Sequence, residues 1–264
     1  MLIIAERINS SRKAIAKAIE EKDATFIRNE AKNQAAAGAA FIDVNAGSFV
    51  GKETDYLKWL VETVQEVVDT PLCLDSPDHK AIKAAYPLCK HKPLINSITL
   101  EAERLEGLLP LVAEEGLSVV ALCQSEDSMA ETTEAKVELA GQLLEKTAAA
   151  GVPDEHVFID PLVYPVSTNP ESALATVKAI AQIMDRFPGV HTTCGLTNVS
   201  YGMPQRKLIN RTFLAVALTH GLDSAIIDPT DDQLYAVLTA ATLVMGQDSF
   251  GMNYITAFRA GRLG

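Results

Sequence analysis

The sequence of 264 residues lacks the short motifs that mark several common classes of enzyme. It has no GxSxG nucleophile motif, and no GxGxxG or GxxxxGK(S/T) loop that would cradle a nucleotide phosphate. The five histidines are scattered, without HxH or HExxH spacing, which argues against a catalytic zinc and predicts no tightly bound metal. Any chemistry must therefore be performed mostly by the ligands.

Cysteine and positive charge are also scarce. The four cysteines show no CxxC spacing, and we expect them to be reduced, buried and apolar in a cytoplasmic protein. The 23 Lys and Arg residues face 34 Asp and Glu, and the net charge of −11 argues against a nucleic-acid partner, which binds through phosphate neutralisation. Because no apolar stretch is long enough to cross a bilayer, no membrane role is expected.

What the sequence contains is eight short apolar runs, each ending at a polar or acidic residue and separated from the next by a helical stretch. The runs are residues 2–5, 41–42, 72–74, 94–95, 119–122, 157–159, 194–196 and 225–227. Strands buried on both faces read as continuous apolar runs, and eight of them alternating with helices predict a closed TIM (β/α)₈ barrel. The length fits one such domain, covering residues 1–264.

Helical patterns fill the intervals between these runs. They cover residues 11–37, 53–68, 79–89, 101–115, 130–150, 170–187, 204–220 and 232–243. Four glycines, at 38, 116, 151 and 221, follow such stretches, where a left-handed glycine closes a helix. The last segment, 248–264, has no clear period, and two interpretations stay open for it: a closing helix or part of a subunit interface.

The residues that end the runs are the candidate site, because the active site of this barrel lies at the carboxyl ends of its strands. They predict a rim of carboxylates and carboxamides with almost no fixed positive charge. Asp75, Asn96 and Asp160 end the third, fourth and sixth runs. Carboxylates accept hydrogen bonds and carboxamides both donate and accept, so the set suits a neutral heterocycle rich in N–H donors, such as a 2-amino-4-oxo pterin. An Asp or Asn at a strand end can equally cap the next helix, and Asp75 and Asp78 are the most open to that alternative. Further rim residues are ambiguous between support of the site and helix capping: Glu6, Asp43, Asn45 and Asp228.

A second candidate is the loop CGLTNVSYGMPQR at residues 194–206. Gly195 permits a close backbone approach, and Thr197 and Asn198 offer uncharged hydrogen-bonding groups. A site that handles a weakly basic nitrogen would use such a carboxamide. The alternative is an ordinary polar loop between a strand and a helix.

Seven motifs in order give the chain a family resemblance. They are ERIN (6–9), DVNAG (43–47), LCLDS (72–76), LINS (94–97), IDPL (159–162), GLTNVS (195–200) and LINRTFLA (208–215). Together they resemble the methyltetrahydrofolate:corrinoid-protein methyltransferases, a family that includes the folate domain of cobalamin-dependent methionine synthase. The resemblance spans the chain from residue 2 to about residue 228.

The resemblance implies a pterin-binding barrel with defined roles for these residues. Asp75, Asn96 and Asp160 would hold the pterin ring, and Asn198 would hydrogen-bond the reacting N5, with Asp160 tuning the same proton. The remaining folate contacts implied are Gly195, Thr197, Tyr201 and Arg206, the last near the aminobenzoyl-glutamate. Tyr201 departs from the family, because its acetogen member has an amide side chain there.

The implied reaction moves a methyl group between N5 of tetrahydrofolate and the cobalt of a corrinoid, in a direction that the site residues leave open. The DxHxxG signature of a corrinoid module is missing, so we expect a separate protein to carry the cobalamin. The family also implies a homodimer. Two alternatives remain: a dihydropteroate synthase, whose GGESTRPG-like and DPGxGF loops read DVNAGSFVGKE and DPLVYPVS here, and a non-catalytic folate-binding subunit.

Overall fold

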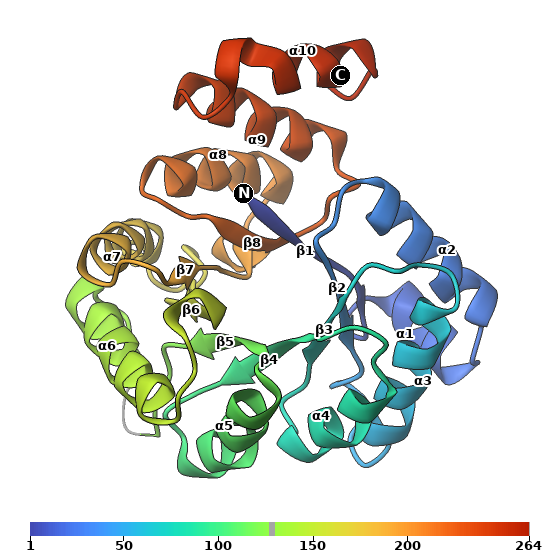
Figure 1. Ribbon diagram of the computed structural model, residues 1–264. Coiled ribbons are helices and arrows are strands. Elements are labelled where there is room, and N and C mark those ends of the chain that lie inside the picture. The colour runs from blue at the N-terminus through green and yellow to red at the C-terminus, as the bar shows by residue number, and fades with distance from the viewer. Residues whose placement is uncertain (127–129, 264) are drawn as a thin grey trace.

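The computed structural model describes residues 1–126 and 130–263, and it is a barrel of parallel strands ringed by helices (Figure 1). The eight strands lie in the order β7-β6-β5-β4-β3-β2-β1-β8. Their bounds are β1 (Leu2–Asn9), β2 (Phe41–Asn45), β3 (Leu72–Asp75), β4 (Leu94–Ile98), β5 (Ser118–Leu122), β6 (Val157–Asp160), β7 (His191–Thr192) and β8 (Ser224–Ile227). The predicted (β/α)₈ barrel is confirmed.

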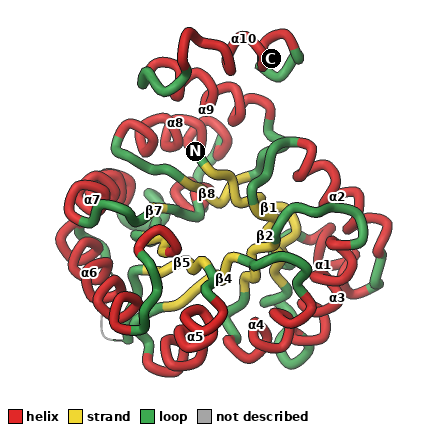
Figure 2. The backbone as a smooth tube through the Cα atoms, viewed as in Figure 1, coloured by secondary structure: helices red, strands yellow, loops and turns green. Residues whose placement is uncertain are grey.

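Helices follow the strands and cover the outside of the barrel (Figure 2). The α-helices are α1 (Lys13–Glu20), α2 (Ala24–Ala36), α3 (Glu53–Gln65), α4 (His79–Ala85), α5 (Ala102–Glu115), α6 (Thr133–Ala149), α7 (Ser172–Arg186), α8 (Arg206–Thr219), α9 (Asp232–Val244) and α10 (Met252–Arg259). Short 3₁₀ helices are η1 (Tyr86–Leu88), η2 (Asp154–His156), η3 (Leu196–Ser200) and η4 (Ser249–Gly251). Among these helices, within the described residues, none is long and apolar enough to span a membrane.

The barrel closes between β7 and β8 with few backbone bonds. The two strands are joined through a bridge between Gly195 and Ile226, in which the Ile226 N–H donates to the Cys194 carbonyl at 3.0 Å. One residue pair adds a side-chain link, since the Ser224 hydroxyl donates to the Thr192 carbonyl at 2.8 Å. This seam lies directly before η3, which carries part of the candidate site.

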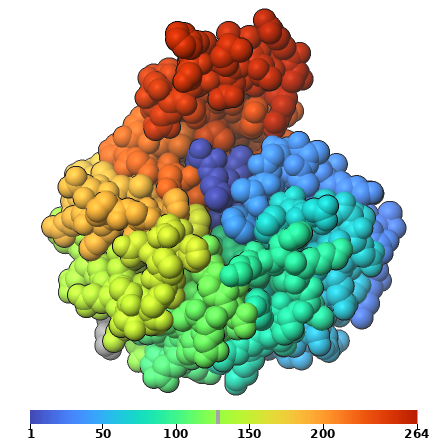
Figure 3. Space-filling view, viewed as in Figure 1, coloured from blue at the N-terminus to red at the C-terminus, as the bar shows by residue number. Residues whose placement is uncertain are grey.

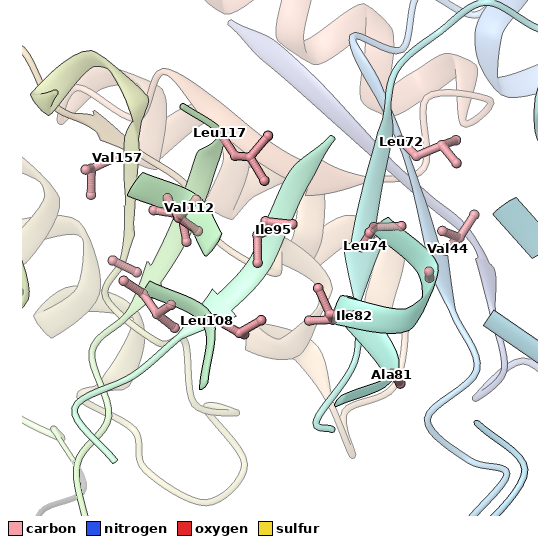
Figure 4. Close-up of a cluster of buried hydrophobic side chains, with 14 of the residues drawn as sticks. Val44, Leu72, Leu74, Ala81, Ile82, Ile95, Leu108, Val112, Leu117 and Val157 are labelled. Atoms are coloured by element: carbon pink, nitrogen blue, oxygen red, sulfur yellow. The ribbon is translucent and has the colours of Figure 1, made fainter. Parts of the chain in front are cut away.

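The largest apolar core lies between the strands and the surrounding helices. Figure 4 shows part of it, where Val44, Leu74 and Ile95 of the sheet face Ile82 of α4 and Leu108 of α5. A second cluster is made of alternate strand residues: Ile4, Cys73, Leu94, Val120 and Phe158. Its members come from β1, β3, β4, β5 and β6, so it fills the barrel interior beneath the strands' carboxyl ends.

Three sequence predictions about elements are wrong in detail. The seventh strand is His191–Thr192 instead of residues 194–196, because Leu196 begins η3. The single helix expected at 11–37 is two helices, since Lys22 has φ of +52° and the Asp23 carboxylate caps α2 by accepting from the Phe26 N–H. The helix expected at 79–89 stops at Ala85 and continues as η1.

Other expectations from the sequence hold. The glycines at 38, 116, 151 and 221 all have positive φ. All four cysteines are free, although Cys89 is only half-buried. The segment expected at 248–264 contains η4 and α10, and its last residue lies outside the described residues. Figure 3 shows this segment projecting beyond the rest of the barrel.

Candidate active site

A cavity of about 1320 Å³ lies at the carboxyl ends of the strands. Its walls include all but one of the residues that the sequence nominated: Glu6, Asp43, Asp75, Asn96, Asp160, Gly195, Thr197, Asn198, Tyr201, Arg206 and Asp228. The exception is Asn45, whose amide donates to the carboxylate of Asp75 in the cavity wall. The structure thus brings side chains from opposite sides of the barrel to one chamber.

The two-residue period of a strand explains why these side chains face inward. Asp75, Asn96 and Asp160 each follow a barrel-filling residue, Cys73, Leu94 or Phe158, by two positions. Successive side chains of a strand alternate between faces, so a residue two positions after an inward residue also points inward. The same spacing relates Ile4 to Glu6. The polar chamber is therefore the layer directly above the apolar interior.

Asp75 and Asn96 are neighbours in the register of β3 and β4. The Asp75 carboxylate accepts from the Asn45 amide at 2.9 Å, while Asn45 itself accepts from Ser10 and from the Gly47 N–H. Asn45 therefore supports Asp75. The helix cap is Asp78 instead, which accepts from the Lys80 N–H at 2.8 Å, so the capping alternative for Asp75 does not hold.

Asp160 ends β6, which is separated from Asn96 on β4 by β5, and it is only 7% exposed. One carboxylate oxygen accepts from the Leu162 N–H at 2.8 Å. Burial raises the pKa of Asp160 to about 6, although the hydrogen bond from Leu162 and the charge of Lys136 both act to lower it. Burial likewise raises the pKa of Asp75 to about 6, opposed by the Asn45 amide and by Arg104. Both groups can change protonation near neutral pH.

Asp43 lies deeper in the chamber, in the middle of β2. It is 1% exposed, and its Oδ1 atom has no hydrogen-bond partner in the described part of the chain. Burial, followed by the charge of Asp75, raises the pKa of Asp43 well above its ordinary value. Its place inside a strand excludes helix capping, so Asp43 belongs to the chamber itself.

Glu6 lies within β1, and Asp228 directly follows β8. Glu6 pairs with Arg12 at 2.9 Å and accepts from the Thr197 hydroxyl at 3.4 Å, and burial raises its pKa. Asp228 pairs with Arg7 at 2.9 Å and accepts from Thr230, which shapes the turn before α9. Glu6 therefore ties β1 to the η3 loop, and Asp228 supports the rim.

Asn198 lies on η3 and is exposed to the cavity. Its amide nitrogen would lie 3.0 Å from a β-carbon placed on Gly195, so a larger residue there would push the amide aside. Arg206 braces the same loop, because its guanidinium donates to the Thr197 carbonyl at 2.8 Å and to the Ser200 hydroxyl at 3.0 Å. Tyr201, which is 66% exposed, lies beside Arg206.

The sequence interpretation that the rim carries almost no positive charge is wrong. Basic residues from loops and helices also line the cavity: Arg12, Arg104, Arg206, Lys207 and Arg211. Most are paired, since Lys207 and Arg211 contact Asp231 at 3.1 and 2.9 Å. Analysis of strand ends alone could not find them, because they lie on other elements.

Two supporting residues were also missed. Arg104 of α5 donates to the carbonyls of Ser76, Pro77 and Ser97, and so joins the ends of β3 and β4 beside Asp75. Lys136 of α6 is fully buried beneath Asp160. The helical period offers a signal for Lys136, because it shares the apolar face with Ala140 and Leu143.

The chamber offers carboxylates and amides to a ligand, and no group of three or more His, Cys, Asp and Glu among residues 1–126 and 130–263 is arranged to hold a metal ion. Buried acceptors on two sides of a chamber fit a flat ring with N–H donors on its edge. The unpartnered oxygen of Asp43 adds another polar group that a ligand could satisfy.

Comparisons with known proteins agree with this chemistry. Residues 5–228 match the family model described as pterin binding enzyme. The methylcorrinoid:tetrahydrofolate methyltransferase of Eubacterium limosum is 40% identical over 100% of this chain and 98% of its own length. The methionine synthase of Mycobacterium tuberculosis is 32% identical over 86% of this chain, which spans only 20% of that protein.

Solved structures of low sequence identity share the fold. A dihydropteroate synthase from Xanthomonas albilineans, solved with 4-aminobenzoic acid, has a TM-score of 0.67 at 16% identity and covers 93% of this chain and 92% of its own. One from Coxiella burnetii, solved with pteroic acid, has a TM-score of 0.67 at 12% identity, with 92% and 94% covered. At such identities the likeness concerns the barrel alone.

Proposed function

The chain belongs to the family of pterin-binding enzymes, and we propose that its reaction moves a methyl group between N5 of tetrahydrofolate and the cobalt of a corrinoid. The observation that carries the proposal is the match, over the full chain, to the methylcorrinoid:tetrahydrofolate methyltransferase. The resemblance in seven sequence motifs agrees with it. The chain is thus a methyltransferase, and the relative's name favours transfer from the methylcorrinoid to tetrahydrofolate.

The folate's pterin ring would lie between the two sides of the chamber. Asp75 and Asn96 on β3 and β4 would bind one part of its edge, and Asp160 on β6 would bind another part. With pKa values of about 6, both aspartates are mostly ionised at neutral pH and can accept from the N–H groups of the ring. Their hydrogen bonds to Asn45 and Leu162 fix their direction before the folate arrives.

Asn198 would act at the reacting nitrogen. The corrinoid would carry the methyl group on its cobalt, so the chain's own residues need to orient the folate, exclude water and manage the proton that N5 holds when it is not methylated. A carboxamide suits this task because it can accept from a protonated N5 or donate to a neutral one. Arg206 braces η3 through its hydrogen bond to the Thr197 carbonyl, and Gly195 leaves room for the Asn198 amide at the cavity.

The corrinoid would reach this site on a separate protein that docks over the cavity mouth. Arg206 would face the aminobenzoyl-glutamate part of the folate, with Thr197 and Tyr201 along the same wall. We also expect a homodimer that works in the cytoplasm, where its four free cysteines stay reduced.

The experiment that tests the proposal is a stopped-flow spectrum in both directions. Cob(I)alamin mixed with methyltetrahydrofolate and enzyme should convert to methylcobalamin, and methylcobalamin mixed with tetrahydrofolate should show the reverse change. Absence of any enzyme-dependent spectral change, with free cobalamin and with a corrinoid protein, would contradict the proposal. A stable folate complex in that case would favour the non-catalytic folate-binding alternative.

The dihydropteroate synthase alternative needs its own test, because the cavity rim does carry basic residues such as Arg12 and Lys207. Its expected loops are replaced here by DVNAGSFVGKE and DPLVYPVS. Pteroate formation from hydroxymethylpterin pyrophosphate and 4-aminobenzoate, measured with the same preparation, should be absent.

A further inference from the structure

Lys136 is the largest side chain that the described part of the chain buries completely. Its ammonium group donates to the carbonyl oxygens of Pro161 at 2.7 Å and of Leu162 at 2.6 Å. It also lies 5.0 Å from the centre of the Tyr164 ring. A buried ammonium is costly unless it is fully hydrogen-bonded, and an apolar residue at this place on α6 would pack without that cost.

The two carbonyls that Lys136 binds belong to the turn that follows Asp160. Leu162 has φ of +58°, a conformation that residues other than glycine seldom adopt. In this conformation its N–H donates to the Asp160 carboxylate at 2.8 Å. The ammonium group therefore fixes a strained turn whose N–H orients Asp160.

Lys136 also provides positive charge close to Asp160. The thiols of Cys123 and Cys194 adjoin the carboxylate from the ends of β5 and β7, and burial keeps both thiols neutral by raising their pKa. Glu131 lies in the segment before α6, and its negative charge favours the protonated form of Lys136. The same charge helps to raise the pKa of Tyr164. Among these groups Lys136 is the cation: burial raises the pKa of Asp160, and the positive charge of Lys136 lowers it.

We propose that Lys136 is a positioning residue of the pterin site, which holds the turn after β6 against Asp160 and keeps the Asp160 carboxylate ionised for the folate. The inference rests on the proposed function, because it takes Asp160 to be an acceptor for the pterin. Lys136 itself touches the turn and does not reach the ligand.

The pH dependence of folate binding should reflect the titration of Asp160 and of Lys136. Asp160, with a pKa of about 6, loses its acceptor charge as pH falls through that value. Burial lowers the pKa of Lys136 to about 8, so the ammonium is lost as pH rises through that value. Affinity for tetrahydrofolate should therefore be highest between these two limits.

The test measures the Kd of tetrahydrofolate calorimetrically, without oxygen, from pH 5 to pH 9.5. In Lys136→Met we expect the acid midpoint to rise by about one pH unit, so that affinity falls about twofold at pH 7 and about tenfold at pH 5, and we expect the alkaline limb to disappear. Lys146→Met, which removes an exposed charge near the end of the same helix, should match the wild type. A loss of affinity by one constant factor at every pH, or no loss, would overturn the inference.

A double-mutant comparison distinguishes an effect of Lys136 that acts through Asp160 from a general loss of structure. In Asp160→Asn position 160 no longer titrates, and the remaining acid limb reflects Asp75, whose pKa is about 6. Adding Lys136→Met to this variant should leave that limb unchanged, and a shift there would also overturn the inference. If Lys136→Met does not fold, Lys136→Gln, which keeps N–H donors, takes its place under the same criteria. Because binding is measured without a corrinoid, a wild type that binds folate but transfers no methyl group would defeat the proposed reaction alone.

Discussion

At the scale of single residues, Asn198 differs from the other polar residues of the chamber because its side chain is freer to move. Asp75, Asp160 and Glu6 are each held by hydrogen bonds, whereas the Asn198 amide is exposed to the cavity and rests against Gly195. Such an amide can change partners as N5 gains or loses its methyl group. Its contribution should therefore appear in the rate of methyl transfer more than in folate binding.

The corresponding variant is Asn198→Ala. We expect kcat/KM for methyl transfer to fall roughly 10- to 1000-fold, on the scale of losing one preorganised polar contact. Stopped-flow kinetics give the rate, and calorimetry should show a folate Kd close to that of the wild type. Asn33→Ala, on the exposed surface of α2, is the control. Unchanged transfer kinetics in Asn198→Ala would remove Asn198 from the mechanism.

Asp160 illustrates a conflict between stability and function. Its folded-state pKa of about 6 lies above the ordinary value of 3.8. The group therefore contributes its full stability below about pH 4, and that contribution is lost as pH rises through 6. A shift of about two pH units corresponds to on the order of 3 kcal/mol, an upper figure for this buried group.

Asp160→Asn should remove this penalty. Between pH 4.5 and pH 8, the free energy of unfolding without ligand should decline less in Asp160→Asn than in the wild type, by about 1–3 kcal/mol. Urea denaturation at both pH values measures it, with the exposed Asp185→Asn on α7 as control. The same variant should bind tetrahydrofolate more weakly at pH 8. Equal pH dependence in the three proteins would contradict the raised pKa.

At the scale of elements, the apolar runs predicted reliably which segments are buried. They predicted less reliably whether each buried segment forms a strand. Seven runs became strands because their alternate residues fill the barrel interior or face the helices. Residues 194–196 are also buried or nearly so, yet they form the bridge and the start of η3. An apolar run of that length is compatible with either conformation, and the choice depends on the closure of β7 against β8, which the local sequence does not encode.

Packing between α4 and α5 gives a prediction at this scale. A β-carbon on Gly107 would lie 2.6 Å from the His79 ring, whereas one on Gly141 of α6 would lie at an ordinary 3.5 Å from Phe187. Gly107→Ala should lower the free energy of unfolding by about 1–3 kcal/mol through overpacking. Gly141→Ala should be neutral or stabilising by about 0.5–1 kcal/mol, because alanine favours the helix.

Urea denaturation of the two variants and the wild type measures the difference. Because α5 also carries Arg104, which joins the ends of β3 and β4, Gly107→Ala should weaken folate binding as well. Similar unfolding midpoints for both variants would mean that the His79 ring moves aside freely.

At the scale of the whole molecule, the sequence located the chamber because strand ends in a parallel barrel must converge on one face. It identified Asp75, Asn96 and Asp160 as facing inward, and the two-residue period explains why. The helical period indicates that Lys136 is buried, but the sequence could not place Lys136 or Arg104 at the site, because both reach it from helices whose distance to the strand ends depends on packing. Arg12, Lys207 and Arg211 of the rim were missed for the same reason, and Arg206 was found only through the family resemblance.

The final prediction concerns the seam of the barrel, which relies on side chains where backbone bonds are few. The Asp223 carboxylate accepts from the Thr192 N–H at 2.9 Å and contacts the His191 ring nitrogen at 2.6 Å. Asp223→Ala leaves that N–H without its partner, so the free energy of unfolding should fall by about 1–3 kcal/mol. Urea denaturation measures this loss, with Asp69→Ala in the exposed loop before β3 as control.

The seam should also couple stability to catalysis, because η3 with Asn198 begins directly after the Gly195 bridge to β8. Loosening β7 would let that amide sample more positions, so Asp223→Ala should lower kcat for methyl transfer severalfold while Asp69→Ala leaves it unchanged. Hydrogen exchange across residues 191–200 should accelerate in Asp223→Ala, with residues 72–75 at the opposite wall unaffected. Faster exchange spread evenly over all strands would instead mean that the barrel opens as one unit and that the seam has no special role.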